Sequence, residues 1–399
     1  MDNAVDIAVV GAGLVGTPLA HILSRQGYSV ALIDAENVMS VTDSSNNTSR
    51  DTDICSALRQ RCTALSMGTR QWLEAEGLWE EVAVDACPIR QVHVSHKGYF
   101  GSTRLQADEL DVDAVGYVVN NDTLNQAFRQ QLAGSSVQHM TGARVSTVEY
   151  SADGVTVHYA EHALNARLLI AADGLSSVVR QCAGIDTRQV DYDQYAFLGT
   201  VQLKRPHDNI AYERFTDSGP LALLPRPGPY MSFVDCVEPD DRQTLESLSD
   251  QAYLRRLQQR FGHRLGRFEA VGPRFVTPLV RIEATEQVAQ RTVLLGNAAR
   301  LLHPVGGQGY NLAMRDAAQL QCLLKNAGDS DPGSPDLLAK FVQQRQGDQA
   351  QVVQFTDLLA RGFRGKTALP AHLRALGLMT LDTVSPLRQR FARRTMGMA

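Results

Sequence analysis

The alternation of apolar and polar positions predicts a strand–helix–strand unit near the start of the chain. Ile7–Val10 is a short apolar run typical of a buried strand, and residues 14–26 carry apolar side chains at helical spacing. Gly27 stands where a glycine commonly ends a helix, and Val30–Ile33 is a second apolar run. The pattern therefore predicts a βαβ unit.

The next part of the chain carries more varied signals. Residues 38–53 are polar without any period, which predicts a surface loop. Residues 61–79 have helical spacing. Residues 115–132 predict a strand followed by a helix that Asn121 or Asp122 caps.

The rest of the chain alternates between strand and helix patterns. Residues 143–172 predict three strands, a β-meander that returns to the first sheet, and residues 185–280 are rich in strand patterns. A further strand at 292–295 leads through a glycine-rich loop to a helix at about 310–325. Residues 326–336 break that helix as a linker, and the chain beyond them is predicted to be helical.

Composition and charge exclude some classes of partner. The 399 residues are 44% hydrophobic and 21% charged, which is ordinary for a soluble globular protein, and the formal net charge is −4. Because nucleic-acid-binding proteins usually have a basic balance, no nucleic acid is expected as a partner. The segment from residue 361 to the end is nevertheless basic, with Asp382 as its one acid.

The cysteines and the chain start bear on location. The six cysteines lie far apart without any CxxC pair, so they are expected to be reduced thiols rather than a disulfide framework or a zinc site. No stretch approaches the roughly 20 apolar residues that span a bilayer, and the start lacks the pattern of a signal peptide. We expect a cytoplasmic protein without a metal centre.

The turn inside the first unit has the glycine spacing of a dinucleotide-binding site, at Gly11, Gly13 and Gly16. The first glycine permits the tight turn, the second lets the backbone approach a pyrophosphate, and the third allows close helix packing. Asp34 follows the second strand, where a carboxylate accepts hydrogen bonds from ribose hydroxyls. The alternative is a glycine turn that serves packing alone, and this unit does not separate NAD from FAD.

Three segments together resemble the fingerprints of the single-component FAD-dependent aromatic hydroxylases. They are GAGLVG at 11–16, LLIAADGLSSVVR at 168–180 and LLGNAARLLHPVGGQGYNLAMRDAAQL at 294–320. Other segments, including AYERFTDSGPLALLP and the tail LGLMTLDTVSPLRQRFARRTMGM, are similar to the ubiquinone-biosynthesis branch, and most to its 2-octaprenyl-6-methoxyphenol hydroxylases. The resemblance runs nearly end to end, with residues 40–58 as the aberrant part.

This resemblance implies an α/β fold with a Rossmann-like FAD-binding domain, a β-sheet substrate domain and a helical C-terminal region. The FAD-binding domain is implied in three parts, because strands of the substrate domain interrupt it. The implied ranges are 1–75, 111–183 and 277–328 for the FAD-binding domain, 76–110 and 184–276 for the substrate domain, and 329–399 for the helical region.

The resemblance also implies which residues bind FAD. Asn297 stands where most members have an aspartate that binds the ribityl chain, and an amide also hydrogen-bonds hydroxyls. Arg61 is implied beside the flavin, with Gln60 near a position where an acid is common. The implied cofactor-binding set is Gly11, Gly13, Gly16, Asp34, Arg61, Asn121, Asp173, Gly174, Gly296, Asn297, Gly307, Gln308 and Gly309.

The late glycine loop has the features of a flavin-ring contact. Reduced flavin carries negative charge near N1 and the C2 carbonyl, and residues 307–309 precede a helix whose N-terminus offers backbone donors. Pro304 has no backbone donor and stiffens the turn, so it can form a wall on the oxygen and substrate side. His303 fits either a general base for phenol chemistry or a structural hydrogen bond. The candidate catalytic residues are Pro304, His303 and Arg61.

The implied activity is hydroxylation of a polyprenyl (6-methoxy)phenol ring in ubiquinone biosynthesis. Reduced FAD would add O2 to form a C4a-hydroperoxide, with NADPH or NADH as a transiently bound reductant because the chain has no second GxGxxG. The alternatives are the same flavin chemistry at another ring position or on another aromatic compound, and a flavin-bound scaffold in a biosynthetic complex.

A lipid substrate implies peripheral membrane contact on the inner face, and other ubiquinone-biosynthesis proteins are further candidate partners. The basic end of the chain would supply the membrane contact. The alternative is a helix packed on the body of the protein with a solvated basic face.

Overall fold

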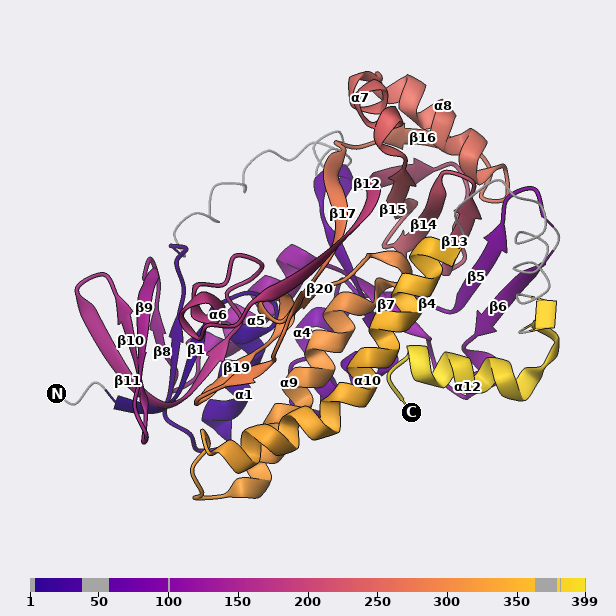
Figure 1. Ribbon diagram of the computed structural model, residues 1–399. Coiled ribbons are helices and arrows are strands. Elements are labelled where there is room, and N and C mark those ends of the chain that lie inside the picture. Colours follow the sequence, from indigo (N-terminus) through magenta and orange to yellow (C-terminus); the bar gives the residue numbers. More distant parts are fainter. Residues whose placement is uncertain (1–3, 38–56, 100, 363–378, 381, 399) are drawn as a thin grey trace.

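A computed structural model describes residues 4–37, 57–99, 101–362, 379–380 and 382–398 (Figure 1). Its first large sheet has eight strands, of which six follow the order β18-β19-β11-β1-β2-β8. Strand β10 pairs with β11, and β9 pairs with β10. The bounds are β1 Ala4–Val10, β2 Val30–Ile33, β8 Gln138–Met140, β9 Val145–Tyr150, β10 Val155–Tyr159, β11 His162–Ala171, β18 Val288–Ala289 and β19 Thr292–Leu294.

Parallel pairing at the centre of this sheet confirms the predicted βαβ unit. Strand β1 pairs in parallel with β2 on one side and with β11 on the other, and α1 (Gly16–Arg25) connects β1 to β2. Strands β9, β10 and β11 form an antiparallel meander, as predicted for residues 143–172. The fold is α/β, as expected.

Both faces of β1 are buried, which explains its uninterrupted apolar run. Ile7 and Val9 pack in a cluster with residues of α1 and α9 (Gln308–Ala327). Ala8 and Val10 pack on the opposite face, in a cluster with the meander. A central parallel strand that is covered on both faces has no solvent side, so its sequence does not alternate.

The second large sheet has nine strands in the order β20-β17-β12-β15-β14-β13-β5-β6, with β16 beside β12. Its pairs are antiparallel except for β13 and β5, which run parallel. A three-stranded sheet, β3-β7-β4, lies apart from it in the pairing. The bounds are β3 Cys62–Ser66, β4 Cys87–Ile89, β5 Gln91–His96, β6 Ser102–Gln106, β7 Gly116–Asn120, β12 Thr187–Leu203, β13 Ile210–Thr216, β14 Gly219–Arg226, β15 Tyr230–Val237, β16 Phe268–Val271, β17 Phe275–Ala284 and β20 Arg300–Leu301.

Long helices connect the two halves of the molecule. Figure 1 shows α10 (Pro335–Gly362) running beside α9 and reaching from the first sheet towards the second. Helix α12 (Ser385–Thr395) packs near β6, where Arg388 forms an ion pair of 2.8 Å with Glu109. Further helices are α3 Met67–Ala75, α4 Glu80–Ala83, α5 Asn121–Ala133, α6 Val178–Cys182, α7 Pro239–Ser247 and α8 Asp250–Phe261.

A buried charge network fixes α9 against β20 and α10. Asp316 of α9 is 1% exposed, and its carboxylate accepts from Arg345 Nε at 2.6 Å and from Arg300 Nη1 at 2.9 Å. The side-chain amides of Gln287 and Gln349 also donate to it, at 3.1 and 2.9 Å. Because β20 and α9 flank the late glycine loop, this network holds both ends of that loop.

Three local predictions were wrong. Residues 62–66 form strand β3 rather than a helix, because they pair antiparallel with β7, and the helix starts only at Met67. The helix after β7 is capped by Asn120, whose side chain accepts from the backbone N–H of Asp122, so neither predicted residue is its cap. Helix α9 starts at Gln308 rather than at about residue 310.

The predicted linker at 326–336 is partly packed on the body of the protein. Asp331 forms an ion pair of 2.8 Å with Arg291, and Gly333 is buried against the backbone of Arg167. Its polar composition therefore serves local hydrogen bonding. The predicted polar loop at 38–53 lies outside the described residues.

Candidate active site

The glycine turn after β1 is closely packed at two of its three glycines. Gly11 has φ +105°, and a Cβ added there would lie 2.3 Å from the carbonyl oxygen of Ala172, just past β11. A Cβ on Gly16 would lie 2.0 Å from the Gly11 carbonyl oxygen. Gly13 is exposed, and nothing lies within 4 Å of an added Cβ. The first and third glycines thus allow chain packing, and the second faces open space.

That open space suits a phosphate group. Val15 precedes α1, and no side chain caps the start of this helix. Thr17 donates its backbone N–H to the Gly13 carbonyl oxygen at 3.1 Å and Pro18 has no N–H, so a ligand would contact the backbone N–H groups of the turn residues before Thr17. Asp34, at the end of β2, accepts from the backbone N–H of Ala12 and, at 2.6 Å, from that of Glu36. The predicted ribose-binding carboxylate therefore lies beside the glycine turn.

Asp173 and Gly174 lie next to the same turn. The hypothetical Cβ of Gly11 also comes within 2.8 Å of the Asp173 backbone nitrogen. Asp173 Oδ2 accepts from the Val179 backbone at 3.3 Å, while its buried Oδ1 has no hydrogen-bond partner among the described residues. A buried acceptor without a partner fits a ligand that brings hydroxyl donors.

The late glycine loop packs onto this group of residues. A Cβ on Gly296 would lie 3.4 Å from Val15 Cγ2, and the Tyr310 hydroxyl donates to the Leu14 carbonyl oxygen at 3.1 Å. Asn297 is exposed beside Gly296, and Gly309 is exposed with nothing within 4 Å of an added Cβ. The two glycine regions, which lie near opposite ends of the sequence, therefore face one site.

Helix α9 begins at the end of this loop, and no side chain caps its N-terminus. Gly307 is its N-cap, and the buried Gln308 side chain donates to the Gly306 carbonyl oxygen at 3.0 Å. Buried Asn311, which the sequence analysis did not single out, accepts from the Ser66 backbone N–H at 2.8 Å and donates to the Gly307 carbonyl oxygen at 2.9 Å. It fixes the loop against the start of α3.

Arg61 and Asn121 meet at the end of the β3–β7 pair. The backbone N–H of Asn121 donates to the Arg61 carbonyl oxygen at 2.9 Å, and Asn121 Oδ1 accepts from Thr63 at 2.7 Å. Arg61 is exposed. Strand β3 also touches the late loop, since a Cβ on Gly307 would lie 3.5 Å from Ala64 Cβ. Arg61 and Asn121 therefore lie at the end of a strand that borders the late loop.

His303 and Pro304 have different surroundings. His303 is buried, its Nδ1 accepts from the Val305 backbone N–H at 3.2 Å, and its ring meets Tyr192 edge-on at 4.9 Å. This geometry supports the structural alternative for His303. Pro304 lines a cavity, and His303 is not among the residues that line it.

This cavity, of about 330 Å³, lies between the late loop, the second sheet and helices α10 and α12. Its wall is mostly aliphatic and aromatic, including Leu105, Leu224 and Phe355. Glu213 of β13 is the one charged residue among the described residues that line it. Burial raises the pKa of Glu213 to about 7, against a hydrogen bond with the Gly306 backbone that lowers it.

The sequence pattern did not mark Glu213 as a site residue. In AYERFTDSG a glutamate among alternating residues is typical of the solvent side of a strand. The available signal was weak, since Ala211, Glu213 and Phe215 share one face of β13 and the two flanking residues are apolar.

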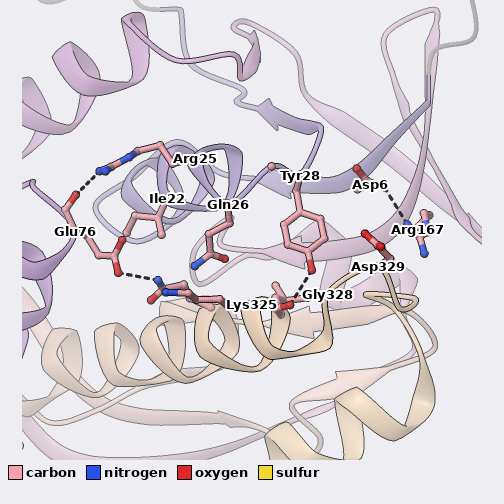
Figure 2. Close-up of a pocket in the computed structure, with 13 residues that line it drawn as sticks. Asp6, Ile22, Arg25, Gln26, Tyr28, Glu76, Arg167, Lys325, Gly328 and Asp329 are labelled. Carbon is pink, nitrogen blue, oxygen red and sulfur yellow. Dashed lines mark hydrogen bonds and ion pairs between the residues drawn. The ribbon is translucent and has the colours of Figure 1, made fainter.

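A second pocket, of about 690 Å³, lies near the start of β1, at the end of the strands opposite to the glycine turn (Figure 2). Several of its polar groups pair with each other or with the backbone. Asp6 binds Arg167 at 3.1 Å, Arg25 donates to the Glu76 carbonyl oxygen at 2.7 Å, and Tyr28 donates to the Leu324 carbonyl oxygen at 2.9 Å. Ligands of such sheets bind at the carboxyl ends of the strands. The glycine site, rather than this pocket, therefore has the position expected of a dinucleotide site.

The glycine turn, the unpartnered Asp173 oxygen and the late loop fit a dinucleotide whose ring end reaches an apolar cavity. A second dinucleotide fingerprint is absent from the sequence, while the cavity adjoins the late loop. Fold and site together define the class of FAD-dependent flavoprotein monooxygenases.

Comparison with known proteins agrees with this class. A family model described as FAD binding domain matches residues 4–356. The ubiquinone hydroxylase UbiL of Rhodospirillum rubrum is 33% identical over 405 residues, which cover 99% of this chain and 90% of that protein. The 3-demethoxyubiquinol 3-hydroxylase of Escherichia coli is 28% identical, with 98% of each chain covered. The chain belongs to this FAD-binding family and is an FAD-dependent hydroxylase that uses O2.

Solved structures share its fold. A variant of HpxO of Klebsiella pneumoniae complexed with FAD superposes with a TM-score of 0.76 at 19% identity, covering 99% of both chains. PqsL of Pseudomonas aeruginosa, described as a probable FAD-dependent monooxygenase, superposes with a TM-score of 0.74 at 22% identity, covering 94% of this chain and all of that one.

None of the described helices is long and apolar enough to cross a bilayer. No group of three or more histidine, cysteine or acidic residues in the described part of the chain could hold a metal ion.

Proposed function

We propose that this enzyme hydroxylates the aromatic ring of a polyprenyl phenol in ubiquinone biosynthesis. The first candidate substrate is a polyprenyl 6-methoxyphenol. The observation that carries the proposal is the apolar cavity, of about 330 Å³, that opens directly onto the late glycine loop. Its volume lies in the usual range of ligand pockets. The names of the relatives, a ubiquinone hydroxylase and a demethoxyubiquinol hydroxylase, support the same pathway.

Some residues of the chain would bind the cofactor, and others would exclude water from the reacting groups. When bound, FAD supplies the activation of O2, with NADPH or NADH as the reductant. The turn at Gly11–Gly16 would hold its phosphates, and Asp34 and Asp173 would accept from its hydroxyls. The late loop with Pro304 would position the ring end against the cavity, whose aliphatic wall excludes water from the reacting groups.

The alternatives remain the same chemistry at another ring position, another aromatic substrate, or a flavin-bound scaffold. A scaffold has no need for an apolar cavity at the late loop. Because a scaffold could still bind a phenol without converting it, turnover separates these alternatives better than binding alone.

The test is turnover of a 6-methoxyphenol that carries a short prenyl tail. The purified protein is expected to show flavin absorption bands and, after anaerobic reduction and mixing with O2, to release a hydroxylated product. Peroxide without product would contradict the proposed substrate, and a colourless protein that cannot be reloaded with FAD would contradict the cofactor.

A cavity-filling variant tests whether the substrate binds in this cavity. Ala222 lines the cavity from β14 and belongs to neither glycine region. Ala222→Phe is expected to keep the flavin bands and to lose most of the hydroxylation, because the added ring occupies the substrate space. Full activity in this variant would show that the substrate binds elsewhere.

We also propose that the outer face of α12 meets an anionic membrane surface. Ala392 and Met396 pack on the body, whereas Val384 and Leu387 are 43% and 49% exposed. On the same helix three arginines are exposed, Arg390, Arg393 and Arg394. Apolar and basic side chains together on one exposed helix suit an interface of anionic lipid headgroups.

Charge reversal at these three arginines tests the membrane contact. The variant Arg390→Glu/Arg393→Glu/Arg394→Glu is expected to bind anionic liposomes at least about 100-fold more weakly, because each of the three basic residues contributes about 1 kcal/mol near such a surface. Flotation with vesicles of anionic and neutral lipid measures the effect.

The control reverses three exposed arginines elsewhere on the protein. The control substitutions are Arg144→Glu, Arg188→Glu and Arg255→Glu. An equal loss of flotation in both triple variants would mean that net charge, rather than α12, governs binding.

A further inference from the structure

One row of side chains on the second sheet crosses the cavity wall and differs from its neighbours. Strand pairing places Thr103 opposite Val94, Val94 opposite Glu213, Glu213 opposite Ala222 and Ala222 opposite Val234. All five residues line the cavity. The row therefore puts two polar side chains on a wall that is otherwise mainly apolar.

The next row along the same strands is apolar throughout the cavity wall. It contains Leu105, Val92, Ala211 and Leu224, which lie at the same level on strands β6, β5, β13 and β14. Side chains two residues apart on a strand share a face, so both rows look into the same space. The polar pair is thus confined to one level of the cavity.

Both polar side chains have hydrogen-bonding capacity left over. Glu213 Oε1 and Thr103 Oγ1 are buried and have no hydrogen-bond partner among the described residues. Glu213 also interacts with the Gly306 backbone, which places its carboxyl group at the late loop. A buried polar atom without a partner is costly unless a ligand satisfies it.

The spacing of the pair matches one substituted ring. Two strand intervals separate Thr103 from Glu213, which corresponds to about 10 Å between their backbones. Val94 lies between them and offers an apolar contact. An aromatic ring lying on Val94 can therefore present one oxygen to each polar side chain.

We infer that Glu213 takes the proton of the ring hydroxyl of the substrate and that Thr103 binds a second ring oxygen. This inference rests on the proposed phenol substrate. The phenol O–H bond breaks, its electron pair stays on the oxygen and delocalises into the ring, and the carboxylate becomes a carboxylic acid. The ring becomes more electron-rich at the positions ortho and para to that oxygen, which is what an electrophilic oxygen atom requires.

The protonation behaviour of the site agrees with this role. A general base works best when its pKa lies near the working pH, and burial brings the pKa of Glu213 to about 7. The titratable and charged side chains around Glu213 include Tyr212 and Arg214 of β13, His93 and His96 of β5, Arg226 of β14, Asp235 and Cys236 of β15, and His303 beside the late loop. Of this set Tyr212 lines the cavity, and burial raises its pKa further above neutral pH.

Two of these neighbours titrate outside the useful range. Burial lowers the pKa of His93 to about 4, and burial raises that of the Cys236 thiol far above its usual value. Neither group therefore changes charge near neutral pH. A rise in rate across neutral pH that Glu213→Gln abolishes is then assigned to Glu213.

The experiment compares the wild type with Glu213→Gln in the FAD-loaded enzyme, using the prenylated methoxyphenol from about pH 6 to about pH 10. At neutral pH the variant is expected to lower kcat about 100-fold with little change in KM, the usual range for loss of a general base. The deficit should shrink towards about pH 10, because the phenol then ionises by itself, as tyrosine does near that pH. Retention of kcat within about twofold, or a deficit independent of pH, would overturn the inference.

Two further variants keep the result interpretable. Glu213→Asp retains a carboxylate and is expected to keep the rise in rate across neutral pH, at reduced kcat. Thr103→Val is nearly isosteric and is expected to raise KM without moving the pH profile. A flat profile in Glu213→Asp would indicate a structural role for Glu213 and overturn the inference.

Binding separates this inference from the proposed function. Calorimetry with the phenol and with its methyl ether is expected to show that the wild type prefers the phenol and that Glu213→Gln loses this preference. If the wild type shows the preference but yields no hydroxylated product, the proposed substrate is wrong and the proton-accepting site stands. If the wild type yields product without any such preference, the reverse holds.

Discussion

Replacing Gly11 by alanine is expected to lower the free energy of unfolding by about 3 kcal/mol and to abolish FAD binding. The added methyl group would lie 2.3 Å from the Ala172 carbonyl oxygen, so β1 and β11 would have to separate at the site. The φ of +105° adds a further cost for any residue with a side chain. Thermal unfolding and the flavin content of the purified protein measure the two effects.

Two other glycines provide matched controls for this result. Gly27→Ala carries a similar φ of +95° with nothing within 4 Å, so it should lose about 1–2 kcal/mol and keep FAD. Gly13→Ala meets no protein atom and should fold like the wild type, but bind FAD more weakly because its methyl group occupies the phosphate space. Normal FAD affinity in Gly13→Ala would contradict the phosphate assignment.

Replacing Asp316 by alanine is expected to lower the free energy of unfolding by about 3 kcal/mol, because Arg300 loses its carboxylate partner and buried Arg345 is left with Asp348, at 2.6 Å. Arg345 and Arg300 now bind its carboxylate at 2.6 and 2.9 Å, and their side chains are 8% and 14% exposed. Since the network holds both ends of the late loop, weaker FAD binding should follow. Urea unfolding of the FAD-saturated protein measures the stability change.

An exposed ion pair supplies the comparison. Glu74 pairs with Arg70 at 2.9 Å within one helix, and its side chain is 52% exposed. Glu74→Ala should cost less than about 1 kcal/mol. If Asp316→Ala were no more destabilising than Glu74→Ala, the buried network would not be what holds α9 to α10.

The predictions that held rest on interactions between residues close in sequence. The first βαβ unit, the meander at 143–172 and the helix after β7 each carry their own apolar period and turn residues. The errors lie where a distant partner decides. Residues 62–66 carry a helical period, yet pairing with β7 makes them a strand, because a sheet partner satisfies their backbone groups at a range that the local pattern does not encode.

Some residues of the candidate site could likewise be predicted from the sequence, and others needed the tertiary structure. The glycine positions and Asp34 are marked by a short motif, because a tight turn and a phosphate-facing helix start impose fixed spacings on a few residues, whereas Asp173 was implied by the family resemblance. The choice between the two roles considered for His303 needed its neighbours, Val305 and Tyr192, to be known.

The sequence by itself determined the α/β class, the dinucleotide turn and the late loop, since local periodicity and turn geometry depend on neighbours along the chain. Only the tertiary structure decided which residues form the cavity. Its wall is formed by segments between Ala64 and Met396. Glu213 is a candidate proton acceptor only because the late loop covers it and Thr103 lies two strands away. On an uncovered strand the same glutamate would be an ordinary solvated side chain, because water rather than burial would set its charge.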